Sequence, residues 1–183
     1  MGLSLKLFGQ FEVRDGSGTA LSLPTRKTRA LLSYLAVNAD QPQPRERLMA
    51  LLWSDRGEKQ ARQSLNHALR AIRKLSEKED TALIDSDGER VTLRGNALES
   101  DTGRLRELLK ERPDEAAALY GGPFLDGLSV PDPAFEEWLR ATRAEFHALA
   151  CDALEAAAGS TDDPKAIDCL RHLLALDPLR EEA

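Results

Sequence analysis

The stretch KQARQSLNHALRAIRK, residues 59–74, decides the fold of the front half of this chain. On a helix that turns by about 100° per residue, its apolar side chains and the next leucine fall within an arc of roughly 120°. These residues are Ala61, Leu65, Ala68, Leu69, Ile72 and Leu75. The spacing predicts an amphipathic helix over residues 58–75, with this arc facing the core.

The adjoining arc of the same helix is basic and polar. No carboxylate occurs between Glu58 and Glu77, so nothing acidic interrupts this face. Asn and Gln side chains can pair with adenine, and Arg side chains with guanine or phosphate. The face could bind DNA, or it could simply be a solvent-exposed helix face that happens to be basic. The candidate DNA-binding residues here are Lys59, Arg62, Gln63, Asn66, Arg70, Arg73 and Lys74.

The composition is that of a globular chain with an uneven distribution of charge. Its 183 residues are 42% hydrophobic without a long apolar run, which argues against membrane insertion. The net charge is -6, but residues 1–74 hold 13 Lys and Arg against 6 Asp and Glu, and the remainder holds 12 against 25. A basic front and an acidic back predict two modules, with DNA contact confined to the first.

The start of the chain and its cysteines indicate a cytoplasmic protein. MGLSLKLFGQFEV, residues 1–13, is strand-like and lacks the pattern of a signal peptide. Cys151 and Cys169 are the two cysteines, which provides no disulfide framework.

A small sheet and two helices are expected before the basic helix. Apolar residues alternate from Leu3 to Val13, with a bulge or bend at Gly9, and residues 20–23 can return as an antiparallel strand. A helix capped by Thr25 should run to about residue 37, and a second should carry Pro44 in its first turn. Two short helices before a longer basic one follow the order of a helix-turn-helix unit.

A β-hairpin is expected directly after the basic helix. Residues 82–84 and 90–94 flank a turn with the sequence DSDG, so the hairpin would form a wing. Arg90 and Arg94 could approach the phosphates or the minor groove, and we place Arg90 in the predicted interface. Asp85, Asp87 and Glu89 oppose such contacts, so the helix is the stronger candidate.

These residues carry a family resemblance. A sheet, three helices and a hairpin, with LLW at 51–53 and LRAIRK at 69–74, resemble the winged helix of OmpR/PhoB-type regulators. The specific form is similar to the N-terminal domain of the SARP family, the Streptomyces antibiotic regulatory proteins. The resemblance implies a third helix in the major groove and a wing along the minor groove. The wing departs from the family pattern, because ERVTL at 89–93 replaces the usual glycine and aromatic ending.

The back half is helical in pattern. A stripe from Phe135 to Leu154 predicts a helix of about 24 residues, and a further helix is expected over 167–176. Antiparallel helices of this kind can stack as in tetratricopeptide arrays. Residues 119–146, LYGGPFLDGLSVPDPAFEEWLRATRAEF, resemble the start of the bacterial transcriptional activator domain, which implies packing, self-association or effector response without catalysis. We expect the aromatics to be core residues rather than a ligand site: Phe124, Phe135, Trp138 and Phe146.

No enzyme motif stands out in the sequence. A Walker-type phosphate loop, a Gly-x-Ser-x-Gly elbow and a His-Glu-x-x-His helix are all missing, so we expect neither catalysis nor a cofactor. His147 with Cys151 and Cys169 with His172 have a spacing that zinc could use. On amphipathic helices Cys is usually a small apolar residue, so we expect no metal.

The predicted fold is mainly α with a small β component. We expect an OmpR/PhoB-type winged helix at 1–96 and a tetratricopeptide-like helical domain at 97–183 that is truncated at its C-terminal end. The predicted function is sequence-specific transcriptional regulation. Double-stranded DNA is the expected partner, with RNA polymerase and a second copy of the chain as further candidates. The alternative is an interaction scaffold, or a sensor fragment of a larger signalling protein, whose winged helix no longer reads DNA.

Overall fold

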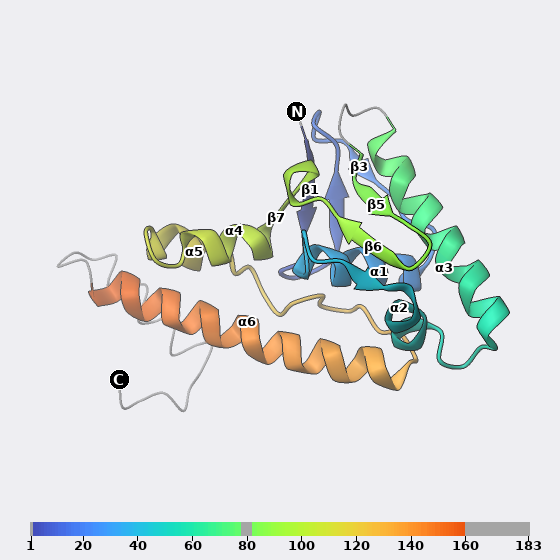
Figure 1. The fold of residues 1–183 in the computed structure, drawn as a ribbon. Coiled ribbons are helices and arrows are strands. Elements are labelled where there is room, and N and C mark those ends of the chain that lie inside the picture. Colours follow the sequence, from blue (N-terminus) through green and yellow to red (C-terminus); the bar gives the residue numbers. More distant parts are fainter. Residues whose placement is uncertain (1, 78–81, 160–183) are drawn as a thin grey trace.

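The computed structural model describes residues 2–77 and 82–159. Helices account for most of the regular structure, which confirms a mainly α fold with a small β component (Figure 1). In chain order the elements are β1 (Leu3–Lys6), β2 (Glu12–Arg14), β3 (Ala20–Leu21), α1 (Arg26–Val37), β4 (Gln43–Pro44), α2 (Arg45–Leu52), α3 (Glu58–Arg73), β5 (Ile84–Ser86), β6 (Arg90–Leu93), β7 (Leu98–Ser100), α4 (Asp101–Leu108), α5 (Pro113–Leu119) and α6 (Pro133–Gly159). Short 3-10 helices occupy Lys74–Ser76 and Gly95–Ala97.

The first sheet has the strand order β3-β2-β1-β7. β1 and β2 are antiparallel, and the chain reverses between them through Gly9, whose φ of 84° suits glycine. The bend expected at Gly9 is therefore part of a full chain reversal. β3 pairs antiparallel with β2, as predicted. The fourth strand, β7, was not predicted; it pairs parallel with β1, placing Leu98 beside Leu3.

The helices of the front half start close to the predicted residues. The Thr25 side chain accepts a hydrogen bond from the Thr28 N–H, which caps α1 as expected. The placement of Pro44 within the first turn of α2 was wrong. Pro44 is the residue before the helix, where it pairs with Arg90 in the extended strand β4. α3 follows a short turn and ends in the 3-10 helix.

The predicted hairpin is present, but its first strand lies two residues later than expected, so Asp85 and Ser86 pair with β6 instead of forming the turn. The hairpin is also bonded to the start of α2. β5 and β6 are antiparallel, and β4 adds to the outer edge of β6 to give the order β4-β6-β5. The backbone N–H of Arg45 also donates to the Glu89 carbonyl at 2.8 Å. The hairpin consequently stands beside α3, with its turn near the first residues of α2 (Figure 1).

The back half places a long helix below α1 and α2 (Figure 1). The helix predicted from Phe135 to Leu154 is α6, which has 27 residues and packs against α2 and α5 (Figure 1). Arg143 of α6 donates to the carbonyls of Phe124 and Leu125, both at 2.8 Å, and so holds the preceding loop. The helix predicted over residues 167–176 lies outside the described residues.

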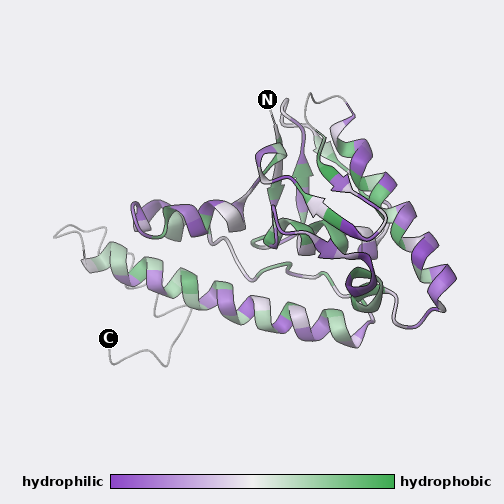
Figure 2. Ribbon diagram, in the orientation of Figure 1, coloured by the Kyte–Doolittle hydropathy of each residue, from purple (hydrophilic) through white to green (hydrophobic). Residues whose placement is uncertain are grey.

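The largest hydrophobic cluster among the described residues contains side chains of both halves. Phe8 of the front half lies 5.3 Å from Phe146 of α6, measured between ring centroids, and Tyr34 lies 5.1 Å from Trp138. In Figure 2 the hydrophobic residues of α3 lie on the side toward this core and the hydrophilic ones on the outer side. Of the four aromatic residues predicted to be in the core, Phe124, Phe135 and Phe146 are fully buried. The fourth, Trp138, packs against the core and is partly exposed. This shared packing fixes α3 relative to α6.

Candidate nucleic-acid interface

α3 lies at the edge of the molecule with one face open (Figure 1). Ala61, Leu65, Leu69 and Ile72 are at most 3% exposed, which confirms the predicted inward arc. The opposite side is hydrophilic along the helix (Figure 2). Every candidate on this helix and its last turn is exposed: Lys59, Arg62, Gln63, Asn66, Arg70, Arg73 and Lys74.

The cations on this face have few partners within the molecule. Arg62 pairs with Glu58 at 3.1 Å, and an exposed pair one helical turn apart contributes about 0.5 kcal/mol at most. Arg73 donates to the Ser86 hydroxyl of β5 and so links α3 to the hairpin. Within the described residues, no carboxylate of the helical half forms a salt bridge with α3. The guanidinium groups therefore remain available to an outside anion.

Arg90 is exposed at the start of β6, next to the hairpin turn. The Asp87 carboxylate accepts the backbone N–H groups of Arg90 and Glu89 at 2.6 and 2.7 Å. These bonds hold the pKa of Asp87 below its usual range, so the tip keeps a negative charge. Arg94 pairs with Asp85 at 3.4 Å. Arg90 is thus the better placed of the two hairpin arginines, although acidic neighbours surround it.

A groove of about 720 Å³ runs between the hairpin turn and α3. Three of the predicted site residues line it, namely Arg62, Asn66 and Arg90. The start of α2 forms another of its walls. The remaining candidates on α3 lie on the open helix face outside this groove. The predicted residues therefore fall into two groups on one surface: those that line the groove and those on the exposed face of α3 beside it.

Arg45 belongs to this groove, although the sequence analysis did not single it out. It is the first residue of α2, and its guanidinium donates to the side-chain oxygen of Asn66. Burial lowers the pKa of Arg45, and the positive charges of Arg73 and Arg62 lower it further. The periodicity of α3 could not reveal a residue from another helix. Arg45 and Arg62 thus place two guanidinium groups in the groove, and Arg73 lies near enough to Arg45 to lower its pKa.

The helical half holds the turn that precedes α3. Asp132, which is 1% exposed, comes just before α6, and its Oδ2 accepts both the N–H and the hydroxyl of Ser54 at 3.0 Å. Its backbone carbonyl accepts the N–H of Glu136 at 3.0 Å. The Oδ1 atom is buried with no hydrogen-bond partner among the described residues. The start of α3 is therefore positioned by a carboxylate at the start of α6.

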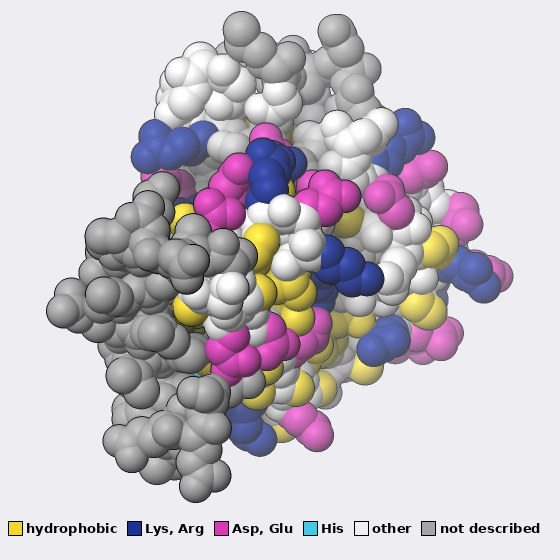
Figure 3. All heavy atoms as spheres, turned by 90° about the vertical axis from the view of Figure 1, so that its left-hand side faces the viewer, with side chains coloured by type: hydrophobic (Ala, Val, Ile, Leu, Met, Phe, Trp, Pro, Cys, Tyr) yellow, Lys and Arg dark blue, Asp and Glu magenta, His cyan; other side chains and the backbone are white. Residues whose placement is uncertain are grey.

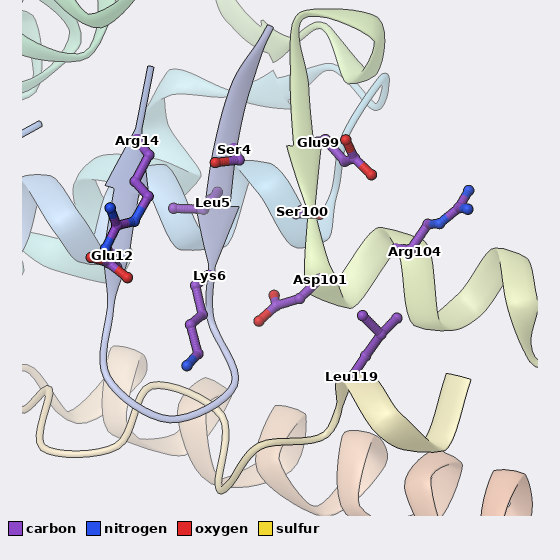
Figure 4. A pocket seen from close by; sticks show the side chains of 10 residues that line it. All are labelled: Ser4, Leu5, Lys6, Glu12, Arg14, Glu99, Ser100, Asp101, Arg104 and Leu119. Atoms are coloured by element: carbon purple, nitrogen blue, oxygen red, sulfur yellow. Dashed lines mark hydrogen bonds and ion pairs between the residues drawn. The ribbon is translucent and has the colours of Figure 1, made fainter. Parts of the chain in front are cut away.

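A second hollow lies beside β1, β7 and α4, and several of its charged groups already have partners (Figure 4). Asp101 accepts the backbone N–H groups of Leu7 and Phe8 there at 2.8 Å. Arg14 pairs with Glu12 at 2.5 Å. On the side of the molecule shown in Figure 3, basic and acidic side chains are interspersed. This hollow is a weaker anion site than the face of α3.

The described residues contain no group of three or more His, Cys, Asp or Glu placed to hold a metal ion. His147 and Cys151 approach each other, with Nδ1 and Sγ 3.9 Å apart. Cys169 and His172, the other half of the zinc spacing, lie outside the described residues. Within residues 2–77 and 82–159, none of the helices has the length and apolarity needed to cross a membrane.

Comparison with known proteins decides the family. The model of the bacterial transcriptional activator domain (BTAD) matches residues 86–183. The chain belongs to the BTAD family. The match begins in the hairpin and continues through the helical half, and it supports a SARP-like protein. Helices α1, α2 and α3 are not part of the matched region.

One solved structure similar to this BTAD-family chain is that of Mycobacterium tuberculosis EmbR in complex with a low-affinity phosphopeptide. The TM-score is 0.70 at 22% sequence identity, and the match covers 97% of this chain and 51% of that chain. The likeness establishes a shared fold, and the BTAD-family chain spans about half the length of its neighbour. A search of curated protein sequences gave no match.

Proposed function

We propose that this BTAD-family chain is a sequence-specific DNA-binding transcriptional regulator of the SARP type. In this proposal it is a winged-helix protein: α3 enters the major groove and the β5–β6 hairpin follows the adjoining minor groove. The observation that carries the proposal is the open outer face of α3, whose cations form no salt bridge with the described helical half. At 16 residues, α3 is about 24 Å long, and the major groove is wide enough to admit a helix.

The electrostatics of the groove favour a polyanion. Arg62 and Arg73 lie close enough to Arg45 to lower its pKa, because their positive charges repel its own. A phosphate group placed among them would relieve that repulsion and accept charge-assisted hydrogen bonds. Binding to phosphates would provide most of the affinity, while Asn66 and neighbouring arginines would discriminate between bases.

The helical half has a non-catalytic role in this proposal. It positions α3 through Asp132 and Ser54 and offers surfaces for RNA polymerase or for a second copy of the chain. The family description, a bacterial transcriptional activator domain, supports a role in activating transcription. A homodimer would read two half-sites, as many regulators with a recognition helix do.

Salt dependence tests the proposal against the scaffold alternative. Duplexes selected from a random pool are titrated by fluorescence anisotropy at several salt concentrations. The logarithm of the binding constant should fall linearly with the logarithm of salt, and Arg70→Ala should reduce the slope by about 0.9 if Arg70 contacts one phosphate. Arg140→Ala, which removes an exposed arginine from α6, should leave the slope unchanged. If no duplex binds, or if binding ignores salt, the scaffold alternative is favoured and the proposal is wrong.

A further inference from the structure

The contact between Arg45 and Asn66 fixes the orientation of the Asn66 side chain. A guanidinium group has only hydrogen-bond donors, so the atom of Asn66 that faces it must be the carbonyl oxygen Oδ1. This assignment follows from chemistry and does not depend on distinguishing the oxygen from the nitrogen by position. The amino group Nδ2, which makes no hydrogen bond within the described residues, is then the end presented to a ligand.

Arg45 is held where it makes this contact. Its backbone N–H is bonded to the Glu89 carbonyl, so the start of the side chain is anchored between α2 and the hairpin. Arg62 and Arg73 repel its guanidinium and Asp87 of the hairpin turn attracts it, which disfavours positions closer to either arginine. The Asn66 oxygen is a neutral acceptor within reach, and the partly buried Arg45 side chain remains directed toward it.

The orientation changes which base edge Asn66 can read. A free Asn carboxamide pairs bidentately with adenine, because its oxygen accepts from N6 while its amino group donates to N7. Guanine presents two neighbouring acceptors, N7 and O6, in the major groove. Arg45 takes one of the two lone pairs of Oδ1, which weakens Asn66 as an acceptor, while Nδ2 and the other N–H groups of Arg45 form a row of donors beside it. Adenine's N6 amino group would have to share Oδ1 with the Arg45 guanidinium and would lie against its N–H donors, whereas guanine N7 and O6 could accept from both side chains.

We infer that the Arg45–Asn66 pair selects guanine over adenine at the base pair that Asn66 contacts. The inference rests on the proposed function, since it specifies which DNA the same surface prefers. Arg45 acts as a positioning residue: it sets the hydrogen-bonding character of Asn66. Removal of its guanidinium would free Oδ1 and restore the bidentate pairing with adenine.

The experiment uses the full chain and a pool of randomised duplexes. Asn66→Ala identifies the base pair in question as the position at which sequence preference is lost. Four duplexes that differ only at that pair are then titrated with the wild type and with Arg45→Met, which keeps an unbranched side chain of similar length. The wild type should prefer guanine over adenine by about fivefold or more, and Arg45→Met should bring adenine at least level with guanine. Arg90→Met removes a cation from the same groove without touching Asn66, so it should weaken binding and keep the guanine preference.

Each other result overturns the inference in a recognisable way. If the wild type prefers adenine, or if Arg45→Met leaves the guanine preference intact, the pair does not set specificity, although DNA binding by α3 stands. If Asn66→Ala changes no position, Asn66 reads no base. If the wild type binds no duplex in a salt-dependent manner, the proposed function fails together with the inference.

Discussion

Replacing Asp132 tests how firmly the helical half holds the start of α3. Asp132→Ala removes the acceptor of two hydrogen bonds from Ser54, each 3.0 Å long. Hydrogen bonds to a charged group contribute about 1.5 kcal/mol each at the low end, which suits this site because Ser54 is exposed to water. The substitution also removes the buried and unpartnered Oδ1, which returns about 1 kcal/mol. The expected loss of unfolding free energy is therefore about 2 kcal/mol.

Thermal unfolding followed by circular dichroism measures this loss. For a chain of this size, about 2 kcal/mol corresponds to a fall in Tm of about 4–8 °C. Asp132→Asn is the matched control, because an amide keeps an oxygen that can accept from Ser54. Its Tm should stay within about 3 °C of the wild type. Below these temperatures, Asp132→Ala should also bind a selected duplex more weakly, because the first turn of α3 is no longer fixed.

Two results would refute this reasoning. An unchanged Tm for Asp132→Ala would mean that the bonds to Ser54 contribute nothing to the junction. An Asn variant as unstable as the Ala variant would show that the negative charge, rather than its hydrogen bonds, stabilises the turn.

Two further predictions concern stability. Burial raises the pKa of Asp101 despite hydrogen bonds from Phe8 and Leu7, so the folded state keeps its proton to higher pH than the unfolded state does. The contribution of Asp101 to the free energy of unfolding must then fall as pH rises from the ordinary Asp range toward its raised pKa. In urea unfolding across this range, the stability of Asp101→Asn should therefore increase relative to that of the wild type. A difference in stability that does not change with pH would contradict the raised pKa. Gly9→Ala should lower the free energy of unfolding by about 1 kcal/mol, because φ is 84° at this residue. Gly121→Ala, where an added Cβ meets open space, should lower it less. Equal Tm values for the two variants would contradict the backbone strain at Gly9.

The parts of the fold that the sequence predicted are those with strong local periodicity. α3 separates apolar from basic residues cleanly, and the five predicted core residues on it are buried, while Leu75 in the 3-10 helix is partly buried. α6 carries a long apolar stripe, and the hairpin carries a recognisable turn. The boundary expected near residue 97 stays a prediction, although the buried core crosses it.

The missed elements depend on distant pairing. β4 and β7 have two and three residues, too few for an alternating pattern, and each exists because a remote strand pairs with it. The same cause hid Arg45 and Asp132, whose roles come from Asn66 and Ser54 on other elements. Sequence periodicity identifies the face of one helix, but it cannot show which side chain from a neighbouring element completes that face.

A net charge of -6 is compatible with binding a polyanion because the acidic residues act locally. In the helical half, Glu145 pairs with Arg106 at 2.6 Å and Glu115 with Arg112 at 2.9 Å, so part of the negative field is cancelled at its source. At physiological salt the remaining field decays over about 8 Å, which is short compared with the length of α3. At about 0.01 M salt the decay length reaches about 30 Å, and repulsion from the helical half would then extend to a bound duplex. As salt is lowered toward about 0.01 M, the attraction between α3 and DNA and the repulsion between the helical half and DNA should strengthen together. The affinity for DNA should therefore rise less steeply than the number of phosphate contacts alone would predict.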